Sequence, residues 1–141
     1  MTTKPYIHII QYYETDRMGI THHSNYVRFM EEARIDFLKQ AGWDYAKLEA
    51  MGVISPVTRI ECKYKVPTTF EDELRITVMV KECNGIRIQF LYKMQNRHGV
   101  IVCTGESEHC FVSAEGKILR VDREFPEFFE AMKAKSEEHS M

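Results

Sequence analysis

The sequence predicts one α+β domain in which a long helix packs on an antiparallel sheet. Residues 6–13 (YIHIIQYY) are rich in β-branched and aromatic side chains, which favour a strand. Apolar residues then recur three and four positions apart between 26 and 37, which indicates an amphipathic helix. After residue 59 apolar residues alternate with polar ones, which indicates about four further strands. This order of elements is typical of an α+β fold.

The long helix has clear start and stop signals. Its apolar face is formed by Tyr26, Phe29, Met30, Ala33 and Phe37. Ser24 or Asn25 is the expected N-cap, and Gly42 is the expected stop. At 1.5 Å per residue, a helix of about 16 residues would span about 24 Å and lie across several strands. We therefore expect this helix to cover one face of the sheet.

Turn residues divide the middle of the chain into short elements. Asp44 and Gly52 delimit a short helix as its cap and its stop. Three runs alternate apolar with polar residues, as strands with one buried face do: 59–66, 74–81 and 86–94. Asn84-Gly85, between the last two runs, is a strong hairpin signal. The turn at 96–99 (NRHG) then leads into the last part of the sheet.

The last third of the chain continues the same domain. Residues 100–113 are long enough for a final strand or a bent pair of strands. Pro126 then opens a helical tail over about 125–135. We find no linker, repeat or low-complexity tract, and we therefore expect a single domain over 1–141 with its core over about 6–121.

The composition is that of an ordinary globular domain, with 44% hydrophobic and 28% charged residues. With 19 basic and 21 acidic residues, the chain has no excess of positive charge that would attract nucleic acid or an anionic membrane surface. No apolar run approaches the ~18 residues of a membrane span, and the amino terminus lacks a signal-peptide pattern. The cysteines form no C-x-x-C pair: Cys62, Cys83, Cys103 and Cys110. We expect free thiols in a reducing cytoplasm and no metal site.

The stretch 13–29 (YETDRMGITHHSNYVRF) combines an acidic residue, a glycine, two histidines and an asparagine just before the long helix. Asp16 follows the predicted first strand, and Gly19 permits a bend in the loop. The loop thus brings a carboxylate close to the amino end of the helix, whose unpaired N–H groups and dipole favour negative charge. This combination suits hydrolysis of an acyl group.

The motif T-D-x-x-G followed by H-x-N-Y is carried by Thr15, Asp16, Gly19, His23, Asn25 and Tyr26. With this motif the chain resembles acyl-CoA thioesterases of the hotdog fold. The nearest branch is that of 4-hydroxybenzoyl-CoA thioesterase and the related bacterial short-chain acyl-CoA thioesterases. Weaker matches follow at Glu31, Tyr64-Lys65-Val66-Pro67, Asp72 and Leu74. The resemblance spans about residues 6–121.

The resemblance implies a long central helix wrapped by a curved antiparallel sheet. It also implies that two protomers join their sheets at an edge, that dimers assemble into a homotetramer, and that acyl-CoA lies between protomers. His22 departs from the family pattern, because that position is commonly aromatic in this branch, and the departure bears on acyl preference. No cofactor is implied beyond the coenzyme A of the substrate.

By the same resemblance, the catalytic residues are Asp16, His23 and Asn25. A carboxylate can take a proton from water or attack a thioester carbon directly, and both roles stay open for Asp16. The backbone N–H of His23 is the expected donor to the oxyanion, while its imidazole has either a catalytic or a packing role. Asn25 is expected to cap the helix and to hold the loop. Glu31 is an alternative base, because another hotdog branch uses a carboxylate of the helix.

Five residues are candidate substrate contacts: Gly19, His22, Tyr26, Arg59 and Lys63. The first three belong to the motif, although the place of Tyr26 on the apolar helix face equally indicates a core residue. Arg59 and Lys63 share one face of a predicted strand with Lys65, and all three could meet the phosphates of coenzyme A. Alternating charges of this kind are also typical of the solvent face of a sheet.

The sequence therefore favours a cofactor-free enzyme that converts an acyl- or aroyl-CoA to the free acid and coenzyme A. Two alternatives stay open. A hotdog dehydratase pairs a histidine with an acidic residue, but the signature of that class, a histidine followed by a proline-rich loop, is missing from this sequence. A non-catalytic acyl-CoA or acyl-carrier binding module would share the fold without turnover.

Overall fold

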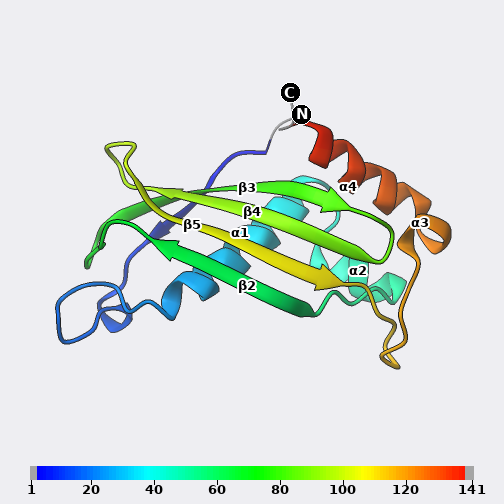
Figure 1. Cartoon of the computed structure of the whole chain (residues 1–141), viewed down its shortest axis with the longest axis horizontal. Helices are drawn as coiled ribbons and strands as arrows, with labels where there is room; N and C mark the ends of the chain where they lie inside the picture. Colours follow the sequence, from blue (N-terminus) through cyan, green and yellow to red (C-terminus); the bar gives the residue numbers. More distant parts are fainter. Residues whose placement is uncertain (1–2, 139–141) are drawn as a thin grey trace.

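The computed structural model of the protein describes residues 3–138 and contains one five-stranded sheet (Figure 1). The strands are β1 (Tyr6–Ile9), β2 (Val57–Tyr64), β3 (Glu73–Cys83), β4 (Arg87–Gln95) and β5 (Ile101–Cys110). Their spatial order is β1-β3-β4-β5-β2, with every neighbouring pair antiparallel. The prediction of an α+β fold with about five antiparallel strands is therefore confirmed.

The long helix α1 (Asn25–Gln40) runs behind the sheet (Figure 1). Phe29 and Met30 on its inner face are fully buried, as the helical spacing predicts, and burying such a side chain stabilises the fold by about 1.5–3 kcal/mol. Alternate residues of β3 and β4 complete this core: Leu74, Ile76, Val78, Val80, Ile88, Phe90, Tyr92 and Met94. Gly105 in β5 lets the helix approach closely, because a Cβ there would lie 2.9 Å from Sδ of Met30.

The short helix α2 (Tyr45–Met51) has the two ends that the sequence predicts. Asp44 is its N-cap, and the Asp44 carboxylate accepts a hydrogen bond from the N–H of Lys47 at 2.8 Å. Gly52 ends the helix with φ of 84°, a left-handed conformation that costs glycine little. The chain then passes directly through residues 53–56 into β2.

The hairpin between β3 and β4 turns at Asn84-Gly85, as predicted. The N–H of Asn84 donates to the carbonyl of Arg87 at 3.0 Å, and Oδ1 of Asn84 accepts from the N–H of Arg87 at 2.9 Å. Gly85 has φ of 93°, and a Cβ at this position would lie 2.7 Å from the Asp122 carboxyl group. Beyond the next turn, β5 is one continuous strand and not a bent pair.

The strand predicted over 6–13 is shorter in the structure. β1 ends at Ile9, and a 3-10 turn, η1 (Tyr12–Glu14), follows it. The chain turns here because the N–H of Gln11 donates to the Glu14 carboxylate at 2.7 Å instead of to a neighbouring strand. The two tyrosines of η1, whose side chains favoured a strand, are mostly exposed.

Two helices close the chain. The helix α4 (Pro126–Glu138) begins at Pro126 as predicted but continues past the predicted end near residue 135. A short helix before it, α3 (Val121–Glu124), was not predicted. α4 buries Phe128 and Met132 and packs against β3, of which β1 pairs only residues 73–76.

The cysteines are not paired in disulfides, as the sequence predicts. The four cysteines are free thiols and lie in β2, β3 and β5. Within residues 3–138, no helix has the length and apolar character needed to cross a membrane.

The edge of the sheet at β2 carries exposed apolar side chains. Val57, Tyr64 and Val66 are 47%, 50% and 37% exposed, and Ile54 just before the strand is 42% exposed. In the part of the chain that the structure describes, no further strand pairs with β2. An open strand edge with apolar side chains is typical of a surface that pairs with another chain.

A buried polar chain lies between α1 and the sheet. Nη1 of Arg34 donates to the hydroxyl of Tyr92 at 3.0 Å, Tyr92 is bonded to Ser107, and Ser107 to Nε2 of His109. Burial, together with the nearby positive charge of Arg34, lowers the pKa of His109 from 6.5 to about 4. His109 is therefore a neutral structural residue at physiological pH.

This lowered pKa predicts a loss of stability in acid. The unfolded chain protonates His109 as the pH falls through 6.5, whereas the folded chain does so only near 4. The stabilisation is thus complete above pH 6.5 and is lost between 6.5 and 4, by about 3 kcal/mol at most. Urea unfolding at pH 7.5 and pH 4.5 should show a larger loss in the wild type than in His109→Gln. Equal losses in both proteins would contradict the prediction.

Candidate active site

A hollow of about 280 Å³ lies where the loop after η1 meets the start of α1 and the end of β2. We call it the Asp16 hollow. Asp16, His23 and Tyr26 line it from the loop and the helix, and Tyr64 and Lys65 line it from β2 and the residue after it. The structure thus brings together the aspartate and the helix start that the sequence motif predicts.

The loop over 15–21 is fixed by its own hydrogen bonds. Asp16 anchors it, because its N–H donates to the carbonyl of Ile20 and its carbonyl accepts from the N–H of Gly19, each at 2.9 Å. Oδ1 of Asp16 accepts from the N–H of Met18 at 2.9 Å. Among the described residues no donor is assigned to Oδ2, so this oxygen is available to a substrate or a water molecule. Gly19 shapes the loop through its φ of 79°.

The backbone N–H of His23, just before α1, has no acceptor among the described residues. The N–H of Asn25 donates to the carbonyl of His22, and the N–H of Ser24 to Nδ1 of His22. Within residues 3–138 the N–H of His23 has no assigned acceptor, although His23 lines the Asp16 hollow. An unpaired N–H at a helix start favours negative charge next to it.

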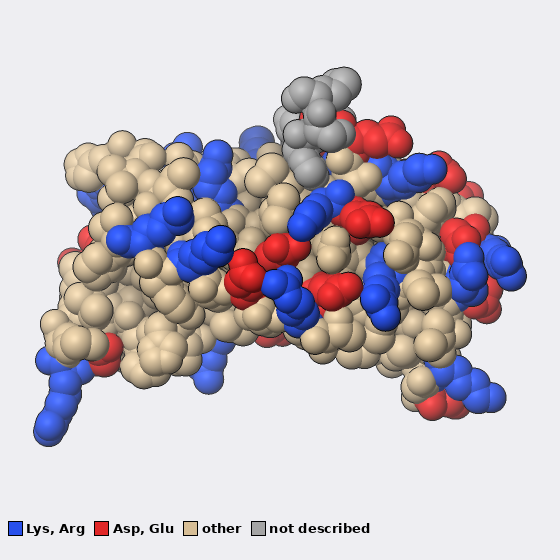
Figure 2. All heavy atoms as spheres, in the orientation of Figure 1, with Lys and Arg blue, Asp and Glu red and all other residues tan. Residues whose placement is uncertain are grey.

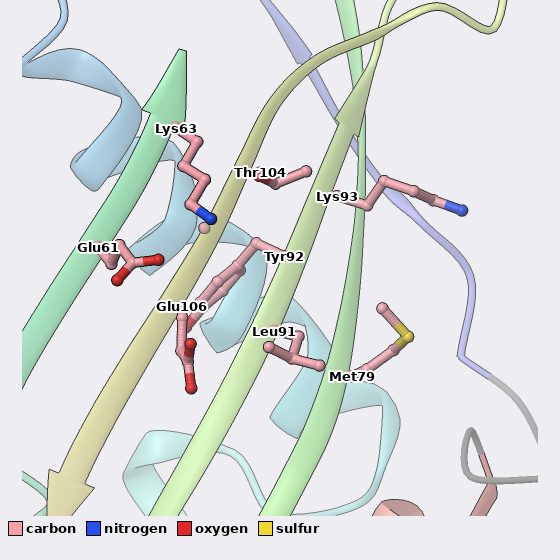
Figure 3. Close-up of a pocket in the computed structure, with 9 residues that line it drawn as sticks. Glu61, Lys63, Met79, Leu91, Tyr92, Lys93, Thr104 and Glu106 are labelled. Carbon is pink, nitrogen blue, oxygen red and sulfur yellow. The ribbon is translucent and has the colours of Figure 1, made fainter. Parts of the chain in front are cut away.

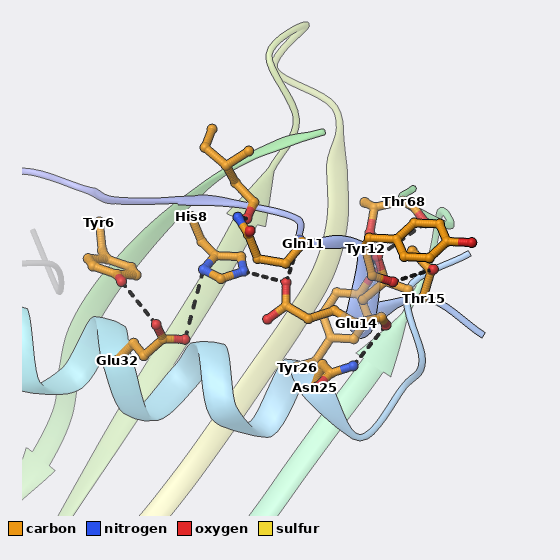
Figure 4. Close-up of polar contacts among 12 residues, drawn as sticks. Tyr6, His8, Gln11, Tyr12, Glu14, Thr15, Asn25, Tyr26, Glu32 and Thr68 are labelled. Carbon is orange, nitrogen blue, oxygen red and sulfur yellow. Dashed lines mark hydrogen bonds and ion pairs between the residues drawn. The ribbon is translucent and has the colours of Figure 1, made fainter. Parts of the chain in front are cut away.

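Asn25 does not cap the helix, and this part of the prediction is wrong. The N-cap is Ser24, which has helical backbone angles and makes no side-chain cap. Asn25 is buried instead, and its Nδ2 donates to the carbonyl of Glu14 at 2.9 Å (Figure 4). The expectation that Asn25 holds the loop is confirmed, because this bond ties α1 to the η1 turn.

Tyr26 belongs both to the core and to the Asp16 hollow. Its ring is 4% exposed, and its hydroxyl is bonded to Oγ1 of Thr68 at 2.8 Å. Thr68 is also bonded to Oγ1 of Thr21 at 2.7 Å. Burial raises the pKa of Tyr26, so its hydroxyl stays protonated and able to donate. These three hydroxyl groups join the loop, the helix and the segment after β2.

The two histidines of the motif differ in position. The imidazoles of His22 and His23 stack with centroids 4.3 Å apart, but only His23 lines the Asp16 hollow. Nδ1 of His22 contacts Oγ of Ser24 at 2.8 Å, and the His22 side chain is exposed. The hydroxyl of Tyr64 donates to the carbonyl of His23 at 3.2 Å and so ties β2 to the helix start.

The predicted coenzyme A contacts Arg59 and Lys63 lie on the outer face of the sheet. Nη2 of Arg59 pairs with the Glu61 carboxylate at 2.6 Å. Lys63 lines a separate hollow over β5 (Figure 3). This face mixes positive and negative side chains, as Figure 2 shows. Their contact with substrate stays a prediction, whereas Lys65, which shares their predicted strand face, lines the Asp16 hollow.

Two further carboxylates bear on the site. Glu31, the alternative base, is exposed on α1 and does not line the Asp16 hollow. Glu14 was missed by sequence reasoning: it is buried, and its carboxylate contacts Nε2 of His8 at 2.9 Å. An acidic residue at the end of a largely apolar run was the only signal for it in the sequence.

A sequence profile of the thioesterase-like superfamily matches residues 10–135, which is most of the chain. The chain belongs to this superfamily. The solved structure of DHNA-CoA thioesterase from Staphylococcus aureus is similar to this thioesterase-like chain with a TM-score of 0.86 and 32% identity. The similarity covers 91% of this chain and 87% of the Staphylococcus chain. The predicted hotdog fold is therefore confirmed.

Curated relatives in the thioesterase-like superfamily carry related activities. YneP of Bacillus subtilis, which has a provisional assignment as an acyl-CoA thioesterase, is 33% identical over 86% of this chain and 89% of its own length. The acyl-CoA thioester hydrolase YbgC of Escherichia coli is 26% identical over 69% of this chain and 72% of its own length. The prediction that the chain is a thioester hydrolase of the acyl-CoA thioesterase family is confirmed by these relatives.

Proposed function

We propose that this protein hydrolyses an acyl- or aroyl-CoA thioester, with Asp16 as the catalytic carboxylate and the N–H of His23 as the oxyanion donor. The single observation that carries the proposal is that both residues, Asp16 and His23, line one hollow at the start of α1. The reaction adds water across the thioester bond and releases a carboxylic acid and the thiol of coenzyme A.

Asp16 has two chemically complete routes. As a general base it takes a proton from water while the oxygen of that water attacks the carbonyl carbon, and the tetrahedral intermediate then expels the coenzyme A thiolate, which takes up a proton. As a nucleophile it attacks the same carbon, expels the coenzyme A thiolate and forms a mixed anhydride, which water then opens at the carboxyl carbon of Asp16. A single turnover in ¹⁸O-water separates these routes, because only the nucleophilic route leaves the label in the Asp16 carboxylate.

The N–H of His23 supports the charge that develops during either route. The carbonyl oxygen of the thioester becomes negative in the tetrahedral intermediate, and the unpaired N–H and the α1 dipole favour that charge. One well-placed donor of this kind contributes roughly 3 kcal/mol in the transition state. Lys65 also lines the hollow and supplies a positive charge for the phosphates of coenzyme A.

The open edge of β2 supports a homodimer. Two copies of β2 paired antiparallel about the middle of the strand would place Tyr64 of one copy beside Val57 of the other. A second hollow of about 290 Å³ lies just before Val57 and is lined by Tyr45, Leu48, Glu49, Val53, Ile54, Ser55 and Pro56. We call it the Pro56 hollow, and in such a dimer it would adjoin the Asp16 hollow of the other copy.

This dimer gives the substrate a complete site. The Asp16 hollow supplies the reacting groups, and the mainly apolar Pro56 hollow of the second copy suits the acyl group. Two such dimers would form the predicted homotetramer, and light scattering on a sizing column measures the mass.

Thiol release from a panel of short, medium, long and aromatic acyl-CoAs tests the proposal. We expect turnover of at least one class without added metal or cofactor. The described residues do include a histidine–carboxylate pair, His8 with Glu14, but neither lines the Asp16 hollow, which disfavours a dehydratase. Tight binding without turnover would instead establish a binding module, and hydration of an enoyl-CoA would establish a dehydratase.

A further inference from the structure

Glu14 is a buried carboxylate two residues before Asp16, outside the T-D-x-x-G motif and outside the Asp16 hollow. Only 5% of the residue is exposed. A buried carboxylate is costly unless hydrogen bonds compensate for lost water, so its partners are informative. Oε1 of Glu14 accepts from the N–H of Gln11 at 2.7 Å and contacts Nε2 of His8 at 2.9 Å (Figure 4).

His8 is held in one orientation between β1 and α1. Its ring packs on Phe29 with centroids 4.1 Å apart. Its other nitrogen, Nδ1, lies 3.9 Å from Oε2 of Glu32, which is beyond hydrogen-bond distance. Glu32 has a partner of its own, the hydroxyl of Tyr6 at 3.1 Å. A carboxylate oxygen accepts hydrogen bonds, so Nε2 of His8 is the donor to Glu14.

The backbone of Glu14 connects the two halves of the proposed catalytic pair. Its carbonyl accepts from Nδ2 of Asn25 at 2.9 Å and from the N–H of His22 at 2.8 Å. These bonds fix the residue before His23, whose N–H is the proposed oxyanion donor. In the other direction along the chain, Glu14 is separated from Asp16 by one residue only.

We propose that Glu14 and His8 are positioning residues for the thioesterase reaction, because their contact fixes the η1 turn and thereby sets Asp16 relative to the N–H of His23. The inference rests on the proposed function, which supplies both reacting groups. Neither positioning residue lines the Asp16 hollow, so neither touches the substrate. Displacing a reacting group by about 1 Å can lower a rate by about 100-fold.

Glu14→Ala is expected to lower kcat by about 30-fold or more and to leave KM within about threefold, because the acyl-CoA contacts stay in place. His8→Phe keeps the ring on Phe29, removes the donor and should lower kcat by about tenfold. The double variant should be no slower than Glu14→Ala, since both substitutions remove the same contact between His8 and Glu14. Glu14→Gln should recover most of kcat, because its amide oxygen can still accept from both the N–H of Gln11 and Nε2 of His8.

Glu32→Gln is the matched control. It changes the other carboxylate beside the same imidazole, yet Glu32 has no bond to the loop that carries Asp16. Its kcat is expected to stay within about twofold of the wild type. The positioning role is refuted if Glu14→Ala lowers the melting temperature but has the wild-type kcat at temperatures below its unfolding transition. It is also refuted if Glu32→Gln loses as much kcat as Glu14→Ala.

Hydrogen exchange of the His22 N–H tests the contact without any activity. This N–H is bonded to the carbonyl of Glu14 and should exchange at least about tenfold faster in Glu14→Ala, with no change in Glu32→Gln. Unchanged exchange would overturn the inference. A wild type that releases no thiol would instead refute the proposed function, and the exchange result alone would then decide whether Glu14 fixes the loop.

Discussion

Replacing Asp16 by asparagine is expected to lower kcat/KM by about a thousandfold, with acyl-CoA affinity close to that of the wild type. Asparagine keeps the shape of the side chain and can still accept from the N–H of Met18 through its amide oxygen. It cannot take a proton from water or act as a carboxylate nucleophile, and general-base catalysis alone contributes about 10² to 10⁴ in rate. Thiol release measures the rate, and calorimetry with a non-hydrolysable acyl-CoA analogue measures the affinity.

Glu31→Gln is the control for the loss in Asp16→Asn. Glu31 is a carboxylate on the neighbouring helix, exposed and outside the Asp16 hollow, and it is the alternative base that the family resemblance suggested. We expect its kcat/KM to be unchanged. Full activity in Asp16→Asn together with a large loss in Glu31→Gln would show that Glu31 is the base and would disprove the assignment of Asp16.

Local signals in the sequence predicted most of the fold. Three features depend only on residues close together in the sequence: the helical spacing from Tyr26 to Phe37, the Asn84-Gly85 turn and the Asp44 cap. The structure agrees with all three. The motif also predicted correctly that Asp16 lies close to the start of the helix, because only six residues separate Asp16 from His23.

Contacts between distant segments could not be predicted from the sequence. Alternation in β1 would favour Ile7 and Ile9 as the buried pair, yet both are more than 40% exposed, and His8 faces inward. The face of β1 that turns inward depends on α1, because the imidazole of His8 packs against Phe29 of this helix. The role of Glu14 depends on the same choice, so it became visible only once β1 and α1 were packed together.

The end of β2 separates two lysines that the sequence pattern places together. Strict alternation places Lys63 and Lys65 on one face of the strand. In the structure the N–H groups of Lys65 and Val66 both donate to the carbonyl of Val102, at 2.9 and 3.1 Å. This shared acceptor breaks the alternation. Lys65 therefore turns into the Asp16 hollow, whereas Lys63 stays on the outer face of the sheet.

Mixed dimers are expected to regain activity that neither parent has. Asp16→Ala removes the carboxylate, and Ile54→Trp fills the Pro56 hollow, which Ile54 lines from an exposed position. Each variant alone should lose nearly all turnover. In a purified heterodimer, one site combines the intact Asp16 of one chain with the intact Pro56 hollow of the other, and the second site carries both defects. The expected kcat per dimer is therefore about half that of the wild type.

A heterodimer kcat of about half the wild-type value distinguishes an active site shared between two chains from one contained within a single chain. If the Asp16 hollow and the Pro56 hollow served the same substrate within one chain, every site of the heterodimer would carry one defect, and activity would stay near zero. Ile7→Trp is the matched control, because Ile7 is equally exposed but lies in β1 at the opposite edge of the sheet. Its homodimer should keep full activity. An inactive heterodimer, or a fully active Ile54→Trp homodimer, would show that the edge of β2 does not complete the active site.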